Sequence, residues 1–199
     1  MKIKAPMFFF LSLGTLFASE LKVVDDQTFA SLHETSSPQE IARVLGTIGV
    51  RFEQWEAGSP VSSASTEEEI KEAYRADIER LQRENGFQSV DVVSLFPDNP
   101  KKREIRAKYL NEHTHSEDEV RFFVQGSGVF FLHCEGKVFS VLCEKGDLIS
   151  IPPEYPHWFD MGADPYFTAI RFFTRTDGWI AHFTGDPIAS HFVSVDEPN

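Results

Sequence analysis

The stretch "VRFFVQGSGVFFLHCEGKVFSVLCEKGDLISI", residues 120–151, is a series of short apolar runs separated by turn sequences. The interruptions are Gly126-Ser127-Gly128, Glu135-Gly136 and Lys145-Gly146, followed by a proline-rich turn at 152–156. Glycine suits such turns because it adopts positive φ angles without steric cost. Short apolar runs at this regular spacing predict successive antiparallel strands, arranged as a barrel or a sandwich.

The residues before this stretch favour helices with single strands between them. Ser37 and Thr66 are suitable N-caps, and each is followed three residues later by a glutamate. The expected helices span 38–46, 66–86 and 99–109, and the expected strands span 50–55 and 89–96. We therefore expect a mainly β protein in which an α-helical N-terminal part packs against a β-barrel, as one domain over residues 20–199.

Composition and charge exclude several classes of protein. The formal net charge of −12 disfavours nucleic-acid binding, which needs a basic surface, and it disfavours attraction to an anionic membrane. The 19 phenylalanines suit strands and an aromatic-lined interior. The two cysteines, Cys134 and Cys143, form no disulfide framework, and we expect small buried side chains rather than a bridge.

Residues 1–19 form a hydrophobic leader that we leave out of the fold. Lys2 and Lys4 precede an uncharged run, which is shorter than the roughly 20 apolar residues that cross a bilayer. The profile is that of a signal peptide, but Leu16 or Phe17 stands where cleavage requires a small residue. The leader is thus an export signal, a disordered extension or a wrongly assigned start.

A candidate metal site begins at "NEHTHSEDE", residues 111–119. On a strand, His113 and His115 face the same side, and Glu119 also lies an even number of residues away. Imidazole and carboxylate groups suit a divalent transition metal. His157, after the proline-rich turn and on an expected facing strand, is the candidate distant ligand. The alternative is a surface histidine pair beside a solvated acidic loop at 117–119.

Two motifs resemble those of the cupins. His113-x-His115-x3-Glu119-x6-Gly126 is similar to their first metal motif, and Gly146-x5-Pro152-x4-His157 is similar to their second. The resemblance implies a jelly-roll-like barrel, the double-stranded β-helix, with a metal ion held inside by three histidines and one glutamate. The chain departs from the motifs at positions that are not ligands, namely Ala107, Glu154 and Met161.

Longer blocks narrow the resemblance to one family. From about Leu21 to about Ser190 the chain resembles bacterial-type acireductone dioxygenases. The blocks are GVRFEQW (49–55), NEHTHSEDEVRFFVQGSGVFFLH (111–133), VLCEKGDLISIPPEYPHWFDMG (141–162), FTAIRFF (167–173) and GWIAHFTGD (178–186).

This resemblance implies a metal-dependent dioxygenase of methionine salvage. Its substrates are O₂ and the acireductone 1,2-dihydroxy-3-keto-5-methylthiopentene, and its cofactor is one Fe(II) or Ni(II) per chain. Iron gives 4-methylthio-2-oxobutanoate and formate, whereas nickel gives 3-methylthiopropanoate, formate and carbon monoxide. We expect a cytoplasmic monomer with no nucleic-acid partner and no membrane insertion, although the leader leaves export open.

Further side chains are candidates for contact with the substrate. Arg121 lies two residues beyond Glu119 and should face the same interior, where it could stabilise a developing negative charge as a catalytic residue. Tyr109, Phe159 and Trp179 could enclose the methylthio tail, with plain core packing as the alternative. Arg171 is expected to pair with a carboxylate. Histidines without ligand spacing are His33, His133, His182 and His191.

Two other functions remain open at the level of sequence. A cupin dioxygenase for another enediol would need the same ligands. A non-enzymatic cupin that binds a ligand or a structural metal would need no arginine near the site, so Arg121 argues against it.

Overall fold

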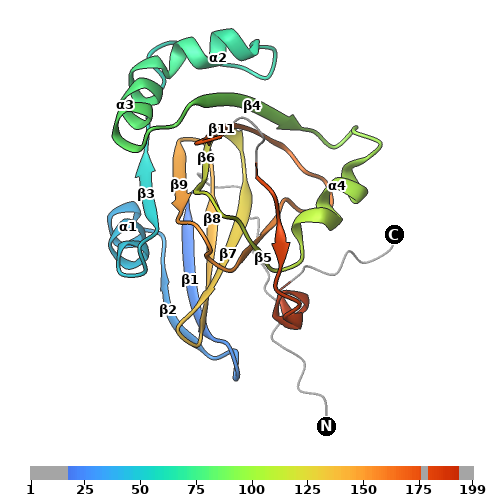
Figure 1. Cartoon of the computed structure of the whole chain (residues 1–199). Coiled ribbons are helices and arrows are strands. Elements are labelled where there is room, and N and C mark those ends of the chain that lie inside the picture. The colour runs from blue at the N-terminus through green and yellow to red at the C-terminus, as the bar shows by residue number, and fades with distance from the viewer. Residues whose placement is uncertain (1–17, 176–178, 193–199) are drawn as a thin grey trace.

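Two antiparallel sheets form the body of the protein, which a computed structural model describes for residues 18–175 and 179–192. Residues 1–17 of the leader lie outside the described residues. Figure 1 shows the two sheets facing each other, with α1, α2, α3 and α4 around them. The helices span Pro38–Gly46 (α1), Glu67–Ala73 (α2), Arg75–Asn85 (α3) and Lys102–Tyr109 (α4), and a 3₁₀ helix spans Pro187–His191 (η1).

The strands of the two sheets come from all parts of the chain. The seven-stranded sheet has the order β12 (His182–Phe183), β5 (His113–Thr114), β10 (His157–Asp160), β7 (Gly128–Cys134), β8 (Lys137–Cys143), β1 (Glu20–Asp25), β2 (Ser31–Thr35). The five-stranded sheet has the order β3 (Arg51–Gln54), β9 (Asp147–Ile151), β6 (Glu119–Gly126), β11 (Phe167–Phe173), β4 (Ser89–Leu95). The mainly β barrel with helices in its N-terminal part is therefore confirmed.

Strict alternation on the central strands decides which side chains enter the barrel. On β6, Phe123 packs into the cluster between the sheets, whereas Phe122 packs on the outer face. On β10, Phe159 points inward and Trp158 points outward. Since successive side chains of a strand face opposite sides, Glu119, Arg121 and His157 lie on the inner face with these phenylalanines.

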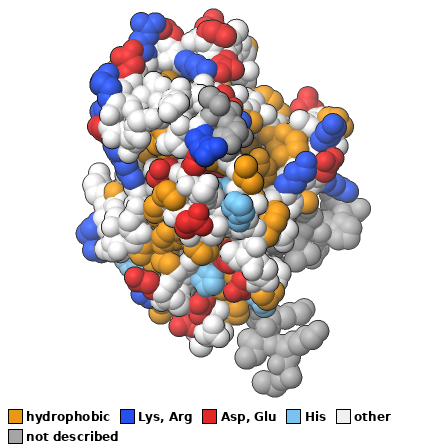
Figure 2. All heavy atoms as spheres, in the orientation of Figure 1, with side chains coloured by type: hydrophobic (Ala, Val, Ile, Leu, Met, Phe, Trp, Pro, Cys, Tyr) orange, Lys and Arg blue, Asp and Glu red, His pale blue; other side chains and the backbone are white. Residues whose placement is uncertain are grey.

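Both outer faces are covered by apolar side chains of the helices. Ile70, Ile78 and Leu81 of α2 and α3 pack on the five-stranded sheet, and Ile188 of η1 packs on the seven-stranded sheet beside Trp158. The outward sides of α2 and α3 carry ion pairs, and Figure 2 shows basic and acidic side chains alternating over this end of the molecule. Burial on both faces explains the nearly continuous apolar runs of the central strands.

The helix expected over 66–86 is divided into two. The N-terminal capping box of Thr66 and Glu69 is present, and Gly86 ends α3 with a left-handed φ of 73°. Between them Tyr74 leaves the helical conformation, with φ −111° and ψ 17°, and its ring packs edge-on against Phe122 at 4.6 Å. Apolar residues continue at helical spacing through the break, so their periodicity did not indicate it.

Two strands of the N-terminal part were not predicted. β1 pairs with β8, and β2 pairs with β1 at the edge of the sheet. Leu21 and Val23 face the barrel and Val24 faces the outer side, and all three are buried. Because both faces of β1 are buried here, its two adjacent valines show no apolar–polar alternation that would identify a strand in the sequence.

Other predictions concern single residues and turns. Cys134 and Cys143 are free, as expected. The β6–β7 turn needs Gly126, whose φ is 67° and where an added Cβ would lie 1.7 Å from the carbonyl oxygen of Tyr166. In residues 18–175 and 179–192 no helix is long and apolar enough to cross a membrane.

Candidate metal centre

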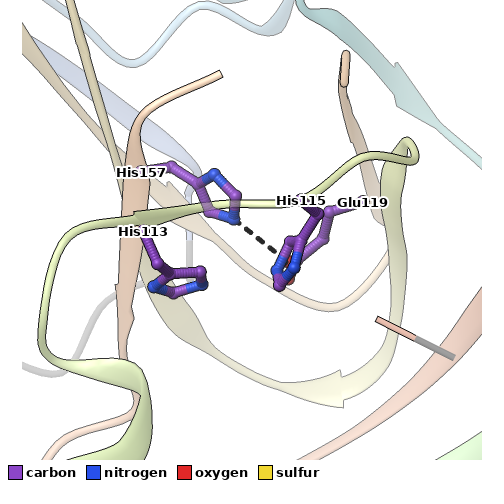
Figure 3. A group of neighbouring side chains, drawn as sticks. All are labelled: His113, His115, Glu119 and His157. Carbon is purple, nitrogen blue, oxygen red and sulfur yellow. Dashed lines mark hydrogen bonds and ion pairs between the residues drawn. The ribbon is translucent and has the colours of Figure 1, made fainter. Parts of the chain in front are cut away.

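Three strands position the four predicted ligands. His113 begins β5, Glu119 begins β6 and His157 begins β10, while His115 follows β5. Antiparallel pairing places His157 directly opposite His113. Figure 3 shows the three imidazoles and the carboxylate pointing toward one another, and one ligand atom from each lies within 4.8 Å of the others. All four residues are buried.

Backbone carbonyl groups fix the orientation of every imidazole. The Nδ1 atom of His113 lies 2.7 Å from the oxygen of Asn111, that of His115 lies 3.0 Å from Ile180, and that of His157 lies 2.7 Å from Tyr155. A carbonyl oxygen only accepts hydrogen bonds, so each Nδ1 carries the proton. Each Nε2 therefore has its lone pair free, which is the state of a metal-binding imidazole.

The Nε2 atoms of His115 and His157 face a carboxylate, which is the arrangement of a cation site. Oε2 of Glu119 lies 2.9 Å from Nε2 of His115 and 3.0 Å from Nε2 of His157. With both imidazoles neutral, these atoms are all acceptors and repel one another unless a proton or a metal ion lies among them. Three imidazole nitrogens and one carboxylate oxygen suit divalent iron or nickel, so the residues present fit the expected metal.

Electrostatics favour the charge states that a metal needs. Burial alone would raise the pKa of Glu119, but Arg121 and the hydrogen bonds with His115 and His157 hold it well below its ordinary value. Burial and the neighbouring His157 lower the pKa of His113 to about 4. Burial also opposes a charge on His115, yet its hydrogen bond with Glu119 raises the pKa of this residue. The carboxylate is thus charged, and His113 is neutral, near pH 7.

Arg121 lies beside the four residues, inside the barrel. Its Nη2 donates to Oε1 of Glu119 at 2.9 Å, and the side chain is only 3% exposed. Aromatic rings surround the guanidinium, with that of Phe159 at 4.6 Å, Tyr109 at 5.4 Å and Trp179 at 5.5 Å. Nε of Arg121 has no hydrogen-bond partner in the described part of the chain. One buried donor is therefore available to a further acceptor.

A cavity of about 670 Å³ leads to the centre. His113 and His115 line it together with Tyr109, Arg171 and Trp179. As expected, Arg171 pairs with a carboxylate: its Nε and Nη2 donate to the two oxygens of Asp91 at 2.9 and 2.6 Å. The cavity therefore joins solvent to the imidazoles through a wall that is partly aromatic and partly basic.

Sequence reasoning brought the right four side chains together, although one step of it differs from the structure. Glu119 does not continue the strand of His113 and His115, because residues 116–118 form a bend and Glu119 starts β6 in the other sheet. The carbonyl groups of Asn111, Tyr155 and Ile180 were missed. A backbone acceptor is present in every residue, so the sequence holds no signal for it.

Two sheets that enclose three imidazoles and one carboxylate define a metal-binding barrel of the cupin class. The sequence pattern of one family matches residues 20–181, and the chain belongs to this family, the ARD/ARD' family.

Individual relatives agree with this membership. The chain is 53% identical over 175 residues to an acireductone dioxygenase of Alcanivorax borkumensis, which covers 87% of this chain and 97% of that protein. It is 58% identical over 152 residues to one of Xanthomonas oryzae pv. oryzae, covering 76% and 81%. A solved structure, acireductone dioxygenase from Bacillus anthracis with cadmium ion in its active centre, matches with a TM-score of 0.73 and 26% identity, covering 85% and 100%. The resemblance inferred from sequence is confirmed, and the chain belongs to a family of enzymes.

Proposed function

We propose that His113, His115, Glu119 and His157 hold one Fe(II) or Ni(II) ion per chain, and that the chain oxidises the acireductone of methionine salvage with O₂. The observation that carries this proposal is the arrangement of the centre. Three Nε2 lone pairs, each fixed by a carbonyl group behind its ring, converge on one carboxylate oxygen in a buried place.

A bound divalent ion would act as a Lewis acid and a template for the two oxygens of an enediolate. The chain supplies the surroundings. Glu119 contributes one negative charge against the two of the ion, which leaves a positive centre for an anionic substrate. Burial of the four ligands keeps water from competing for the same positions.

Arg121 is proposed as the catalytic residue that binds the substrate oxygens. Its Nη2 is held by Glu119, so the guanidinium has a fixed orientation, while its unpartnered Nε can donate to an oxygen that gains negative charge. Charge-assisted hydrogen bonds in a buried site are strong, and here the donor is in place before the reaction.

Tyr109, Phe159 and Trp179 are proposed to enclose the methylthio tail of the substrate. Tyr109 and Trp179 line the cavity, whereas Phe159 lies deeper, against Phe130 at 4.7 Å. An apolar tail would gain from these rings, while the polar end of the substrate would lie between Arg121 and the imidazoles.

The expected location and assembly are also proposals. The described residues include no helix that could span a membrane. We propose a monomer in the cytoplasm, where a small soluble substrate reaches the cavity directly. Light scattering after gel filtration would test the monomer, and fractionation of cells that produce the whole chain would test its location.

The test of the activity uses one protein preparation, stripped of metal and reloaded with iron or nickel. Loss of the ultraviolet absorbance of synthetic acireductone in air should accompany formation of formate and 4-methylthio-2-oxobutanoate with iron. Nickel should give 3-methylthiopropanoate, formate and headspace carbon monoxide. Full metal binding without loss of any enediol would instead indicate a non-enzymatic metal-binding barrel, and faster loss of another enediol would indicate a different substrate.

A further inference from the structure

A second group of potential ligands lies at the opposite side of the β5 segment. Glu112, immediately before β5, His133 on β7 and Asp186, the N-cap of η1, each offer one ligand atom within 4.8 Å of the other two. We call these three residues the second cluster. Glu112 is buried, His133 is half-buried and Asp186 is exposed, so the cluster opens to solvent on one side.

Hydrogen bonds orient the two inner members of the second cluster. Nδ1 of His133 lies 2.7 Å from Oε2 of Glu112, and Nε2 lies 3.2 Å from Oδ2 of Asp26. The other oxygen of Glu112 accepts from the hydroxyl group of Thr184 at 2.6 Å. The backbone N–H group of Ile188 binds Oδ1 of Asp186 at 2.8 Å. Both nitrogens of one imidazole thus face carboxylates, and that of Glu112 is itself held in position by Thr184.

The charges of this region are not balanced by the side chains. Three carboxylates, from Asp26, Glu112 and Asp186, surround one imidazole. Among residues 18–175 and 179–192, no lysine or arginine forms an ion pair with any of the three. Even a protonated His133 would offset only one of the three negative charges. The excess of negative charge around one imidazole favours a divalent cation here.

We propose that the second cluster binds one divalent cation of the zinc class through Nδ1 of His133, a carboxylate oxygen of Glu112 and a carboxylate oxygen of Asp186. An imidazole and two carboxylates are a common ligand set for such ions. Ligand bonds of about 2.1 Å allow two ligand atoms to lie up to about 4.2 Å apart. The three ligand atoms lie within 4.8 Å of one another, so small side-chain shifts complete the site.

Asp26 takes the role of an orienting residue in this arrangement. When a cation occupies the position between Nδ1 and Glu112, the remaining proton of the imidazole lies on Nε2 and is donated to Asp26. A carboxylate that binds the outer nitrogen of a histidine ligand fixes its tautomer and makes it a better ligand. Local sequence patterns do not indicate this arrangement, because Asp26, Glu112, His133 and Asp186 are far apart along the chain.

The cation would tie three separate segments together. Glu112 leads into β5, His133 belongs to the middle of the seven-stranded sheet, and Asp186 begins η1, which covers that sheet. The second cluster shares no residue with the four ligands of the centre inside the barrel, so the two sites can be tested by separate substitutions.

The test is the zinc content of the whole chain. Metal-free wild-type protein and its variants are dialysed to equilibrium against the same micromolar free Zn²⁺, and bound metal is measured by mass spectrometry. His133→Gln and Asp186→Asn should each bind one Zn²⁺ per chain less than wild type. The matched control is His33→Gln, which removes an imidazole that lies 3.5 Å from Glu40 on another part of the surface, and it should bind as much as wild type.

The difference in bound zinc between wild type and His133→Gln decides the test, because any zinc in the barrel centre is common to both proteins. If the two proteins bind equal amounts of zinc, or if His33→Gln loses as much as His133→Gln, the proposal is wrong. His157→Ala gives an independent reading, because it disables the barrel centre alone. The zinc that His157→Ala still binds should be absent from the His133→Gln/His157→Ala double variant. If the double variant binds as much zinc as His157→Ala, that zinc is not bound by the second cluster and the proposal is wrong.

Discussion

At the scale of single residues, Glu119 connects the metal centre to the arginine beside it. One of its oxygens faces the imidazoles of His115 and His157, and the other accepts from Arg121. A single carboxylate therefore sets both the charge of the centre and the orientation of the guanidinium. Changes at Glu119 and Arg121 should have different effects, because only Glu119 faces the place of the ion.

Replacement of Arg121 by alanine should leave metal content unchanged and lower kcat by roughly 10²–10³-fold, the effect typical of losing one electrostatic stabiliser. The reason is that the substrate oxygen loses its donor, while the four ligands stay in place. Metal analysis and turnover are measured on the same sample. Arg80→Ala, which removes a half-buried arginine on α3 with an ion pair to Glu53, far from the site, serves as the control. Loss of metal with normal turnover per remaining ion would make Arg121 a structural residue.

Replacement of Glu119 by glutamine should weaken metal binding by more than about 100-fold, which is the upper range for loss of an outer-shell partner. The amide keeps the shape of the side chain and removes the negative charge between the imidazoles. Competition with a coloured chelator measures the affinity. Glu117→Gln is a matched control, because Glu117 binds Thr174 and Arg175 near the site but faces no imidazole. Equal affinities for both variants would contradict the assignment of Glu119.

The four candidate ligands could be predicted because their side-chain types and spacing are visible in the sequence. The role of His133 could not be predicted from the sequence. Its partners Asp26, Glu112 and Asp186 come from segments that meet only after β1, β7 and η1 have packed together. The lack of a hydrogen-bond partner for Nε of Arg121 could not be predicted either, because it depends on which aromatic rings surround the guanidinium.

At the scale of elements, a buried ion pair joins α4 to the strand of His157. Nε and Nη2 of Arg106 donate to the two oxygens of Asp160 at 2.7 and 3.0 Å, and both residues are buried. The pair fixes the end of β10 relative to the helix that carries Tyr109. Loss of this ion pair should therefore lower the stability of the fold and loosen the position of Tyr109 in the cavity wall.

Replacement of Arg106 by methionine should lower the free energy of unfolding by about 3–5 kcal/mol, the usual cost of leaving one buried charge without its partner. Urea titration followed by tryptophan fluorescence measures the change. Lys108→Met, two residues along the same helix, breaks the exposed pair with Glu104 and should cost less than about 1 kcal/mol. Similar losses in both variants would show that Asp160 has sufficient other partners.

The β6–β7 and β7–β8 turns permit a comparison of two glycines, Gly126 and Gly136, with similar backbone angles. Gly136→Ala places a Cβ at φ 71° with no atom within 4 Å, and should cost about 1–2 kcal/mol from conformation alone. Gly126→Ala has a similar φ of 67°, but its Cβ also meets the carbonyl oxygen of Tyr166. It should therefore cost about 1–3 kcal/mol more than Gly136→Ala. Thermal unfolding of both variants gives the difference. Equal melting temperatures would mean that the turn moves to accommodate the methyl group.

Elements with strict patterns were predictable, and those with local interruptions were not. The capped helix α1 and the strands from β6 to β9 follow from residue type and periodicity. The break at Tyr74 and the pairing of β1 depend on contacts with Phe122 and with β8, which are distant in sequence. Tertiary packing thus determines these features, which local sequence patterns do not indicate.

At the scale of the whole molecule, we propose that residues 1–19 are dispensable for folding and chemistry. A chain that begins at Glu20 retains all of β1 and, of the described residues, gives up Ala18 and Ser19, with the hydrogen bond from Ser19 to Asp147, 2.5 Å long. Its melting temperature should stay within about 4–8 °C of the full chain, the shift expected for roughly 1 kcal/mol. Its turnover with iron should be unchanged. Failure of the shortened chain to fold would show that the leader packs against the barrel.

The separation of His157 from the other three ligands has a consequence in time. During synthesis, residues 113–119 leave the ribosome before the strand that carries His157, which lies 38 residues beyond Glu119. The pocket for the ion closes only when β10 has joined β5 and β7, a late and non-local event. Interactions formed after the folding barrier slow unfolding and leave the folding rate nearly unchanged. Metal supply would then govern how long each folded molecule lasts, rather than how quickly it is made.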